Sequence, residues 1–369
     1  MHRPVVLIPD GDCTFAPAVV RALGLENCWD VVVLSKVHRA SASFSSHCAD
    51  WQLLPCSNEE YHARFADILQ HYIHTIKPDI LLPIHEPSIR LTSQHLEQLR
   101  SSVAVAGVPE VATFDTVVDK GSLANYLQMH DLPHPPSVTA NMVNELFSRG
   151  SAVTFPVLVK SRRSGFGQGI FRCDHPQALL RYLQHTGLKP DEVVIQQLIF
   201  GSDIDCSALC ENGEVLAWTI QAPLHKSGKA YKPPESIQFI DDSHVLETSV
   251  RILRQLKWTG IAHLDFRYDS ERENLYLLEI NARYWGSLMG SIRAGINFPG
   301  LACRHALGLA LPGTRQRECR YGTAKAYLAG MRPWPGHGDT RLSLEESALH
   351  YILQDPGPEL VRLLASQTA

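Results

Sequence analysis

The sequence lacks any long apolar run. Hydrophobic residues make up 44% of the 369 residues, but no stretch of them reaches the about 18 residues that a helix needs to cross a bilayer. The first residues, MHRPVVLIPDGD, turn polar after one short strand-like run. They have neither the apolar core nor the small-residue cleavage site of a signal peptide. These absences predict a cytoplasmic protein that has no membrane as a partner.

A framework of cysteines or histidines is also missing. The nine cysteines are scattered along the chain, and the most closely spaced pair, Cys206 and Cys210, has no second pair at metal-ligand spacing. We therefore expect free thiols that behave as small buried hydrophobes, in a reducing compartment. His71 and His74 have no further ligand cluster nearby, which is typical of a solvated helix face rather than a zinc site.

Nor does one sign of charge dominate. The chain has 34 lysines and arginines against 38 aspartates and glutamates, which gives a formal net charge of −4. Because this balance provides no generally basic surface, we expect no nucleic acid as a partner. The charged fraction of 20% is that of an ordinary soluble globular protein. The length is sufficient for two or three domains.

What the first third of the sequence does contain is an alternation of short apolar runs and helical patterns. Strands are predicted at residues 5–8, 31–34 and 80–84. Helices are predicted at residues 15–23 and 59–76, and a further helix follows the third strand and ends at about Arg100. Short strands that alternate with helices indicate a parallel sheet with crossover connections. The loop after the first strand, PDGDCTFAP, has one glycine and does not match a dinucleotide-binding loop.

His85 and Glu86 follow the third of these predicted strands. In open parallel sheets, ligands bind beyond the carboxyl ends of the strands, so both side chains are candidates for contact with a substrate. The alternative is that Glu86 contacts the start of the next helix and that His85 is solvated.

Two hairpins are predicted in the second half of the chain. Residues 205–218 fold around Asn212-Gly213, a pair that favours the tight turns that match strand twist. Residues 261–268 and 275–282 form the second hairpin, with a turn centred near Arg272. A helix is predicted from Phe114 to Met129.

The second hairpin brings acidic and amide side chains together. With its turn at Arg272, Asp265 lies opposite Glu279, and Asn281 shares their face because alternate residues of a strand point the same way. Directly opposed residues have Cβ atoms about 5 Å apart, so two carboxylates repel unless a cation lies between them. Hard oxygen ligands of this kind suit Mg²⁺, and Arg283 at the edge is suited to phosphate oxygens.

That interpretation depends on the register. A slip of one residue would send one set of side chains to the opposite face. The alternative is an exposed strand face on which Glu279 and Asn281 pair with neighbouring cations.

A glycine-rich loop follows a predicted strand at residues 155–160. Its glycines, Gly165, Gly167 and Gly169, allow close backbone approach to phosphates, and Lys160 at the strand end adds a positive charge. The loop is not a Walker A motif, since no Gly-Lys-Ser/Thr follows. The alternative is a flexible hairpin loop.

A third segment, VVIQQLIFGSDID, runs from residue 193 to residue 205. Its strand, which ends at a glycine, would expose the backbone of residues 196–198 to the edge of an adenine ring, and Asp203 would accept hydrogen bonds from ribose hydroxyls.

In chain order, Lys120, Lys160 with its glycine loop, QQLIFGSD, Asp265 and EINAR resemble the ATP-grasp superfamily. The resemblance is closest to the carbamoyl-phosphate-synthase-like and D-alanine-ligase-like carboxylate–amine ligases, and it spans residues 1 to about 310. It implies an α/β protein in which an open parallel α/β domain precedes a two-subdomain α+β ATP-grasp fold. The implied divisions are residues 1–112, 113–195, 196–311 and a C-terminal extension, 312–369.

The resemblance also implies roles for these residues. Lys120 and Lys160 would contact ATP phosphates beneath the glycine loop, Gln196 and Leu198 would hold adenine, and Asp203 the ribose. Asp265, Glu279 and Asn281 would bind Mg²⁺ or Mn²⁺. Arg283 and Lys160 would act catalytically on the transferring phosphoryl group. The sequence departs from the family at Ala282, Gln196 and Asp265, where proline, glutamate and glutamate or glutamine are common.

The implied reaction is ATP-dependent ligation of a small carboxylate, through an acyl phosphate, to an amine. Residues 224–236, with Lys226, Lys229 and Lys232, form a candidate lid over the site, or a solvated loop. A nucleotide-binding module without ligase activity and an ATP-grasp kinase or carboxylating enzyme are alternatives. The sequence identifies neither substrate, and it leaves the oligomeric state open, a homodimer included.

Overall fold

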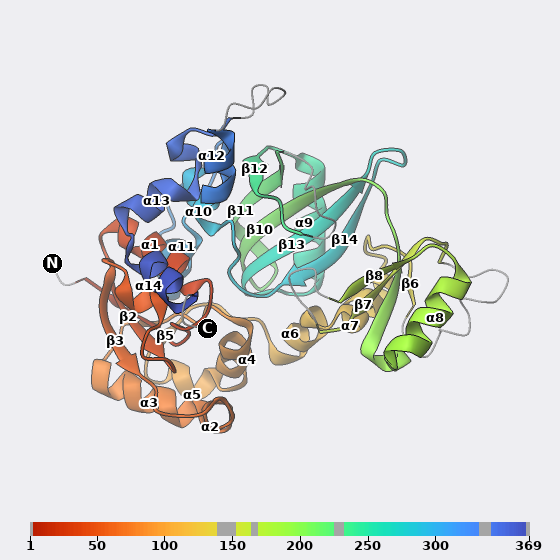
Figure 1. The fold of residues 1–369 in the computed structure, drawn as a ribbon. Helices are drawn as coiled ribbons and strands as arrows, with labels where there is room; N and C mark the ends of the chain where they lie inside the picture. Colours follow the sequence, from red (N-terminus) through yellow and green to blue (C-terminus); the bar gives the residue numbers. More distant parts are fainter. Residues whose placement is uncertain (1–2, 139–152, 164–168, 225–231, 332–340, 367–369) are drawn as a thin grey trace.

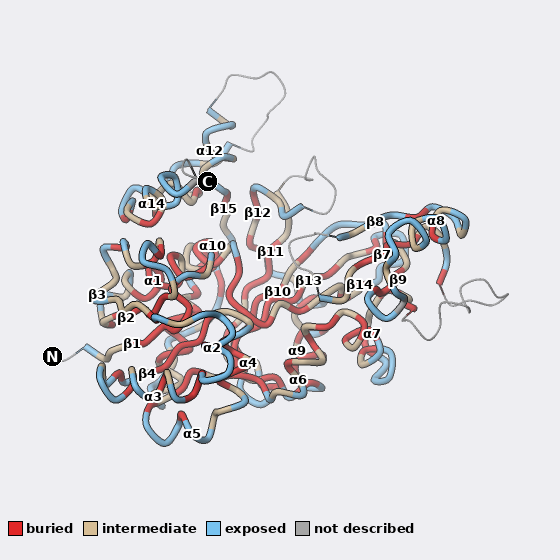
Figure 2. The backbone as a smooth tube through the Cα atoms, turned by 60° about the horizontal axis from the view of Figure 1, so that its bottom comes forward, coloured by how far each residue is buried: buried red, intermediate tan, exposed pale blue. Residues whose placement is uncertain are grey.

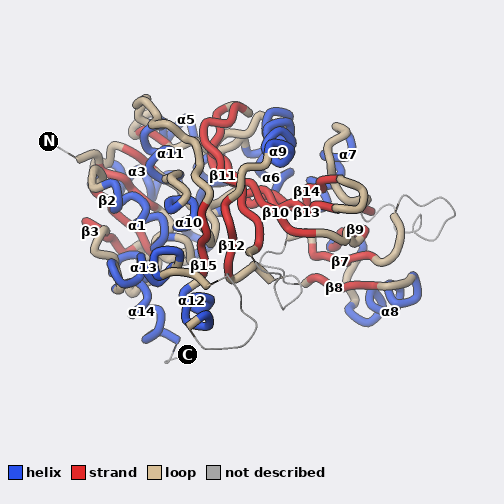
Figure 3. The backbone as a smooth tube through the Cα atoms, turned by 90° about the horizontal axis from the view of Figure 1, so that it is seen from above, coloured by secondary structure: helices blue, strands red, loops and turns tan. Residues whose placement is uncertain are grey.

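The computed structural model describes residues 3–138, 153–163, 169–224, 232–331 and 341–366. Figure 1 shows three sheets arranged along the molecule, with the amino-terminal sheet at one end and a small sheet at the other. The largest sheet lies between them, as the view from above also shows (Figure 3). The mixture of a parallel sheet with two mainly antiparallel ones confirms the predicted α/β fold class.

The amino-terminal sheet is parallel and has the strand order β3-β2-β1-β4-β5. Its strands are β1 (Val5–Ile8), β2 (Asp30–Ser35), β3 (Cys48–Leu53), β4 (Ile80–Leu81) and β5 (Ala104–Val105). The chain runs outward from β1 to β3, then returns to place β4 on the other side of β1. The topological switch point therefore lies between β1 and β4, where a crevice for ligands is expected.

Five helices cover this sheet in sequence order: α1 (Ala16–Glu26), α2 (Asn58–Ala63), α3 (Phe65–Ile76), α4 (Glu86–Gln94) and α5 (Leu96–Arg100). The sequence pattern predicts neither β3 nor β5, and it predicts one helix where α2 and α3 stand. At the edge of the sheet, β3 leaves two of its residues exposed, so its apolar signal is weak. The break between the helices falls at Arg64, which leaves the helical region with a φ of −121°.

The predicted helix from Phe114 to Met129 is also two helices, α6 (Val111–Val118) and α7 (Lys120–Met129). Asp119 separates them, and its carboxylate accepts hydrogen bonds from the backbone amides of Gly121 and Ser122. This is an N-cap, because it satisfies amides that have no partner within a helix. The cap makes Lys120 the first residue of α7.

A four-stranded sheet with the order β6-β9-β7-β8 follows. Its elements are β6 (Ser137–Val138), β7 (Val157–Ser161), β8 (Ile170–Cys173), α8 (Pro176–Thr186) and β9 (Val193–Gln197). The predicted division between residues 195 and 196 would cut β9. The partition of the chain into domains stays a prediction.

The largest sheet has six strands in the order β14-β13-β10-β11-β12-β15. They are β10 (Ser202–Glu211), β11 (Glu214–Pro223), β12 (Ser236–Phe239), β13 (Gly260–Asp269), β14 (Asn274–Asn281) and β15 (Cys319–Gly322), with α9 (Ser243–Gln255) packed against β10 and β11. Figure 2 shows buried chain along the middle of these strands. The turn between β10 and β11 is at Asn212-Gly213, both with positive φ, as predicted.

The end of the chain joins two earlier parts. Strand β15 adds to the edge of the six-stranded sheet beside β12, although it lies in the predicted C-terminal extension. The remaining helices are α10 (Leu288–Arg293), α11 (Phe298–Ala306), α12 (Ala324–Gly330), α13 (Ala348–Gln354) and α14 (Gly357–Ser366). The last two lie next to α1, as Figure 1 shows, and Arg21 of α1 pairs with Asp355 and Glu359.

All nine cysteines are free, which confirms the expected thiols, four of them buried and five partly exposed. Among the described residues, no helix is long and apolar enough to cross a membrane.

Candidate active site

The site is built on the hairpin of β13 and β14. Asp265 lies opposite Glu279, as the sequence predicted, and His263 lies opposite Asn281. The turn is not centred on Arg272, however, because nearer the turn the pairing is offset by one residue. A bulge at Leu278 absorbs this offset.

The bulge decides which way the acidic side chains point. Leu275 and Leu277 are buried, and strict alternation would send Glu279 to the same apolar face. The extra residue changes the phase, so Ile280 is buried instead and Glu279 and Asn281 face the site. The convergence that the sequence predicted is therefore real, but its cause is the bulge.

Three hydrogen-bonding side chains follow one another along this face. Asn281 Nδ2 lies 3.3 Å from Asp265 Oδ2, and Arg283 Nη2 donates to Asn281 Oδ1 at 2.9 Å. Asp265 Oδ1 is buried and has no hydrogen-bond partner among the described residues. Carboxylates that face each other with an orphaned oxygen are a donor set that fits a hard divalent cation.

The protonation states of the two acids differ. Burial, together with the neighbouring carboxylates Asp205 and Glu279, raises the pKa of Asp265 well above its usual value. Burial also opposes ionisation of Glu279, but the Lys120 and Lys160 ammonium groups and a hydrogen bond with Asp265 together outweigh it and lower the Glu279 pKa. These opposite shifts favour a proton on Asp265 over one on Glu279, and a divalent cation bound between the two carboxylates would compete with that proton.

Lys120 comes from the start of α7, far from the hairpin in sequence. Its Nζ lies 3.0 Å from Glu279 Oε2. The Asp119 cap determines this position, and Arg162 reinforces the cap because its Nε donates to Asp119 Oδ1 at 2.8 Å. The structure thus brings the amino end of a helix and a charged lysine to the acidic pair, where phosphate groups are favoured.

Lys160 stands near the end of β7 and is only 6% exposed. Its Nζ donates to Gln196 Oε1 at 2.7 Å, and Gln196 Nε2 lies 3.2 Å from Ser137 Oγ. Burial lowers the pKa of Lys160 to about 8, with Glu279 acting in the opposite direction. Gln196 therefore orients Lys160. Its predicted contact with adenine stays a prediction.

Only part of the predicted nucleotide-binding backbone is described. Gly165 and Gly167 lie outside the described residues, as do Lys226 and Lys229 of the candidate lid. Gly169 has a φ of +66°, a conformation that favours glycine. The Leu198 amide donates to Pro156 O at 2.9 Å, so a contact of this backbone with adenine would use the carbonyl oxygen.

Asp203, the predicted ribose ligand, is half-exposed at the start of β10. Its Oδ1 lies 2.9 Å from Arg267 Nη1. Arg267 also donates to Gly201 O at 3.2 Å, so the arginine fixes both the aspartate and the loop before it.

Arg283 connects the hairpin to the amino-terminal sheet. Its Nε lies 3.3 Å from Glu86 Oε1, and its guanidinium stacks over the Phe15 ring at 4.7 Å. Glu86 and Phe15 follow β4 and β1, so Arg283 sits at the switch point of the parallel sheet. The alternative, in which Glu86 contacts only the start of its own helix, misses this contact with Arg283. Burial and Arg283 lower the pKa of the neighbouring His85.

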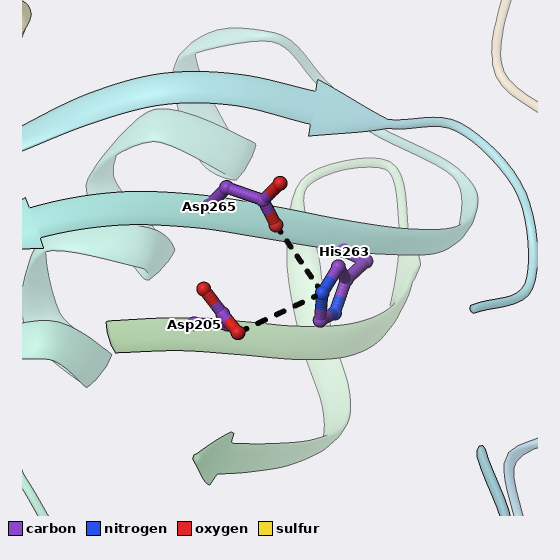
Figure 4. A group of neighbouring side chains, drawn as sticks. All are labelled: Asp205, His263 and Asp265. Atoms are coloured by element: carbon purple, nitrogen blue, oxygen red, sulfur yellow. Dashed lines mark ion pairs between the residues drawn. The ribbon is translucent and has the colours of Figure 1, made fainter. Parts of the chain in front are cut away.

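Two further side chains of the site were not predicted. Asp205 of β10 and His263 of β13 lie beside Asp265, as Figure 4 shows. His263 Nε2 is 3.2 Å from Asp265 Oδ1 and 4.0 Å from Asp205 Oδ2. Alternation could have found both residues, because Asp203 and Asp205 share a face of β10, and His263 and Asp265 a face of β13.

The electrostatics of this group are unusual. Burial raises the pKa of Asp205 to about 7, and burial together with Arg283 lowers the pKa of His263 to about 3. Both shifts favour the uncharged forms, which is what buried groups adopt when no counter-ion is close enough.

A model of the family "ATP-grasp in the biosynthetic pathway with Ter operon" matches residues 191–328, which contain the hairpin and β10. Among curated proteins, the arginine-specific large chain of carbamoyl phosphate synthase from Geobacillus stearothermophilus is 24% identical over 217 residues. That match covers 56% of this chain and 20% of the relative. The chain thus spans about a fifth of the length of such relatives.

Solved structures share the fold. The biotin carboxylase domain of 2-oxoglutarate carboxylase from Hydrogenobacter thermophilus, in complex with MgADP, has a TM-score of 0.65 and 15% identity, covering 85% of this chain and 72% of that one. The L-amino acid ligase from Bacillus licheniformis has a TM-score of 0.59 and 18% identity, covering 83% and 74%. The family model over residues 191–328, the curated relative and the common fold thus confirm the resemblance of this chain to the ATP-grasp superfamily.

Proposed function

We propose that the protein is an ATP- and Mg²⁺-dependent ligase that activates a small carboxylate as an acyl phosphate and joins it to an amine. The observation that carries this proposal is the opposition of Asp265 and Glu279 on adjacent strands, with Asn281 next to them. This donor set fits Mg²⁺, which takes one or two protein carboxylates together with phosphate oxygens and water. ADP complexes of proteins with this fold support a nucleotide at the same site.

In this proposal Asp265, Glu279 and Asn281 would hold Mg²⁺, which would neutralise charge on the phosphates. Lys120 lies 3.0 Å from Glu279 and supplies a second positive charge to the phosphates. Lys160 is oriented by its hydrogen bond to Gln196, and a phosphate group of ATP would pair with its ammonium group. The protein's contribution is thus positioning and electrostatic stabilisation, as phosphoryl transfer requires.

Arg283 is placed to serve both steps. A carboxylate oxygen of the substrate attacks the γ-phosphorus, and the bond to the ADP oxygen breaks. The amine then attacks the acyl carbon, and phosphate leaves with the bonding electrons. Arg283 reaches from Asn281 to Glu86 at the mouth of the parallel sheet. A guanidinium there stabilises the phosphoryl group in transfer and the phosphate that leaves.

The test is turnover of the full chain with Mg-ATP and a panel of amino acids and small carboxylates. ADP, phosphate and coupled product are measured together. Equal amounts of the three, dependent on both a carboxylate and an amine, are expected. ADP without phosphate would indicate a kinase, and ADP with phosphate that requires bicarbonate would indicate a carboxylating enzyme. Tight ATP binding without turnover for any panel member would indicate a binding module.

A further inference from the structure

We propose that Asp205, His263 and Asp265 form a second divalent-metal site, adjacent to the proposed nucleotide-metal site and joined to it through Asp265. The three side chains come from neighbouring strands, β10 and β13, and point toward one another in Figure 4. The proposed function does not require this site, and the site is tested without nucleotide or substrate.

The distances suit a shared ion. One ligand atom from each residue lies within 4.8 Å of the other two. His263 Nε2 is 3.2 Å from Asp265 Oδ1 and 4.0 Å from Asp205 Oδ2. Two ligands that are each about 2.1 Å from an ion are about 3.0 Å apart when adjacent and about 4.2 Å apart when opposite in an octahedron. Both measured separations fall in this window.

An unsatisfied atom points into the group. Asp265 Oδ1 is buried without a hydrogen-bond partner among the described residues. His263 is only 8% exposed, and its Nε2 is directed at this oxygen rather than at solvent. Buried polar atoms are normally paired, so an orphaned oxygen facing a buried imidazole indicates a missing ligand.

Outer hydrogen bonds orient two of the three side chains. Ser207 Oγ lies 2.8 Å from His263 Nδ1, which leaves Nε2 as the nitrogen that faces the group. Gln221 Nε2 donates to Asp205 Oδ2 at 3.0 Å, and Ser287 Oγ donates to Gln221 Oε1 at 2.8 Å. Metal-binding histidines and carboxylates are usually held by such second partners.

Asp265 links the two sites. Its Oδ2 faces Asn281 and the proposed nucleotide-metal ligands, while its Oδ1 faces His263. An aspartate that bridges two ions is the arrangement of two-metal sites, whose ions are about 3.5 to 4 Å apart. An imidazole ligand favours Mn²⁺ or another transition ion over Mg²⁺, which prefers oxygen. The second site therefore selects a transition metal.

The experiment uses Mn²⁺ as the probe on the full chain after removal of metals, without ATP. In the Glu279→Gln background, which weakens the nucleotide-metal site, binding is measured by titration and by electron spin echo spectroscopy of the bound Mn²⁺. We expect one bound ion whose signal is modulated by the ¹⁴N nucleus of an imidazole. Adding His263→Asn should remove the modulation and weaken binding at least tenfold.

His305→Asn is the matched control. His305 Nε2 lies 3.2 Å from Glu211 Oε2, so it is also a histidine beside a carboxylate, but it is more exposed. It should leave Mn²⁺ binding unchanged. Ser207→Ala, which removes only an outer hydrogen bond, should weaken binding by about tenfold. Circular dichroism and thermal melting establish that each variant is folded. If His263→Asn does not fold, Asp205→Asn is used in its place to remove a ligand of the proposed site.

Mn²⁺ binding without ¹⁴N modulation, or equal affinity with and without His263, would overturn the proposal. So would an ion that is lost in the Glu279→Gln background alone, because it would belong to the nucleotide-metal site. None of these outcomes depends on turnover. A failure of the ligase assay with the ¹⁴N signal intact would therefore reject the proposed reaction and leave the metal site standing.

Discussion

Two clusters of charged side chains, one buried and one half-buried, differ in how completely the fold provides them with partners. One joins Arg21 of α1 to Asp355 near the chain end, and the other joins Asp265 and Glu279 in the hairpin. In the first, Arg21 Nε donates to Asp355 Oδ2 at 3.0 Å, and the Ser45 hydroxyl and Ser46 amide donate to the same carboxylate. Burial opposes ionisation of Asp355, but these donors outweigh it and lower its pKa.

The hairpin cluster has the opposite property. Its acids face one another, Asp265 keeps an orphaned oxygen, and the Asp265 pKa is raised. Buried charge alone therefore does not identify a functional site. The difference is that the Arg21 cluster is complete without a ligand, while the hairpin cluster leaves an oxygen and two carboxylates for an ion. Two of the four predictions below test this difference directly, and the other two test Lys160, whose pKa the hairpin carboxylates raise against the effect of burial.

Removal of the hairpin carboxylate should have the largest effect. Glu279→Gln is expected to lower turnover by about 10³-fold or more, because it removes a metal ligand and the partner of Lys120. Thermal stability should be retained, because glutamine has nearly the shape of glutamate and removes a charge that burial disfavours. Glu271→Gln, an exposed acid in the turn of the same hairpin, is the control. Unchanged turnover in Glu279→Gln would show that the metal assignment is wrong.

Disruption of the complete cluster should affect stability instead. Arg21→Met leaves Asp355 buried with only its serine donors and is expected to cost about 3 kcal/mol of unfolding free energy. Turnover per folded molecule should not change. The control is Arg3→Met, which removes an exposed pair with Asp30 at 3.9 Å and should cost at most about 1 kcal/mol. Chemical denaturation measures both. A similar cost for the two variants would contradict the distinction.

The buried lysine of the site, Lys160, predicts that ATP binding depends on pH. Lys160 has a pKa lowered to about 8 by burial. Phosphates favour its charged form, so ATP binding should weaken as the pH rises through about 8, by about tenfold per unit above it. Calorimetry at several pH values measures this, and proton uptake on binding is expected near pH 8. Lys160→Arg should remove the inflection, since arginine stays charged, whereas the exposed control Lys189→Arg should keep it.

A smaller change should follow from the partner of this lysine. Gln196→Glu would place a carboxylate 2.7 Å from Lys160 Nζ, where the amide oxygen now is. An adjacent opposite charge favours the charged lysine, so the inflection should move upward by about one unit. Gln197→Glu on the same strand, which does not contact Lys160, is the control. An unchanged inflection in Gln196→Glu would show that Lys160 does not produce the pH dependence.

Much of the site could be predicted from local pattern. Asp265, Glu279 and Asn281 were placed together because strand alternation is a property of a few consecutive residues, and their pairing is confirmed. The turn at Asn212-Gly213 was equally local. The predicted roles of these residues in binding nucleotide and metal remain predictions.

Elements that depend on distant contacts were missed. Strand β15 joins the six-stranded sheet by pairing with β12, which lies about eighty residues earlier in the sequence. The split of the helix at Asp119 needs Arg162 of another element to hold the capping carboxylate. The sequence did not predict that Asp205 and His263 lie together, because they are far apart in sequence and each alone looks like an ordinary polar residue of a strand.

The sequence by itself determined the members of the hairpin, the alternation of their side chains and the lysine at the end of β7, because strand geometry links neighbouring residues directly. Only the tertiary structure decided the bulge at Leu278, the approach of Lys120 to Glu279 and the contact of Arg283 with Glu86. These depend on how separate elements pack, and packing is determined by the apolar surface of the whole chain rather than by any local pattern.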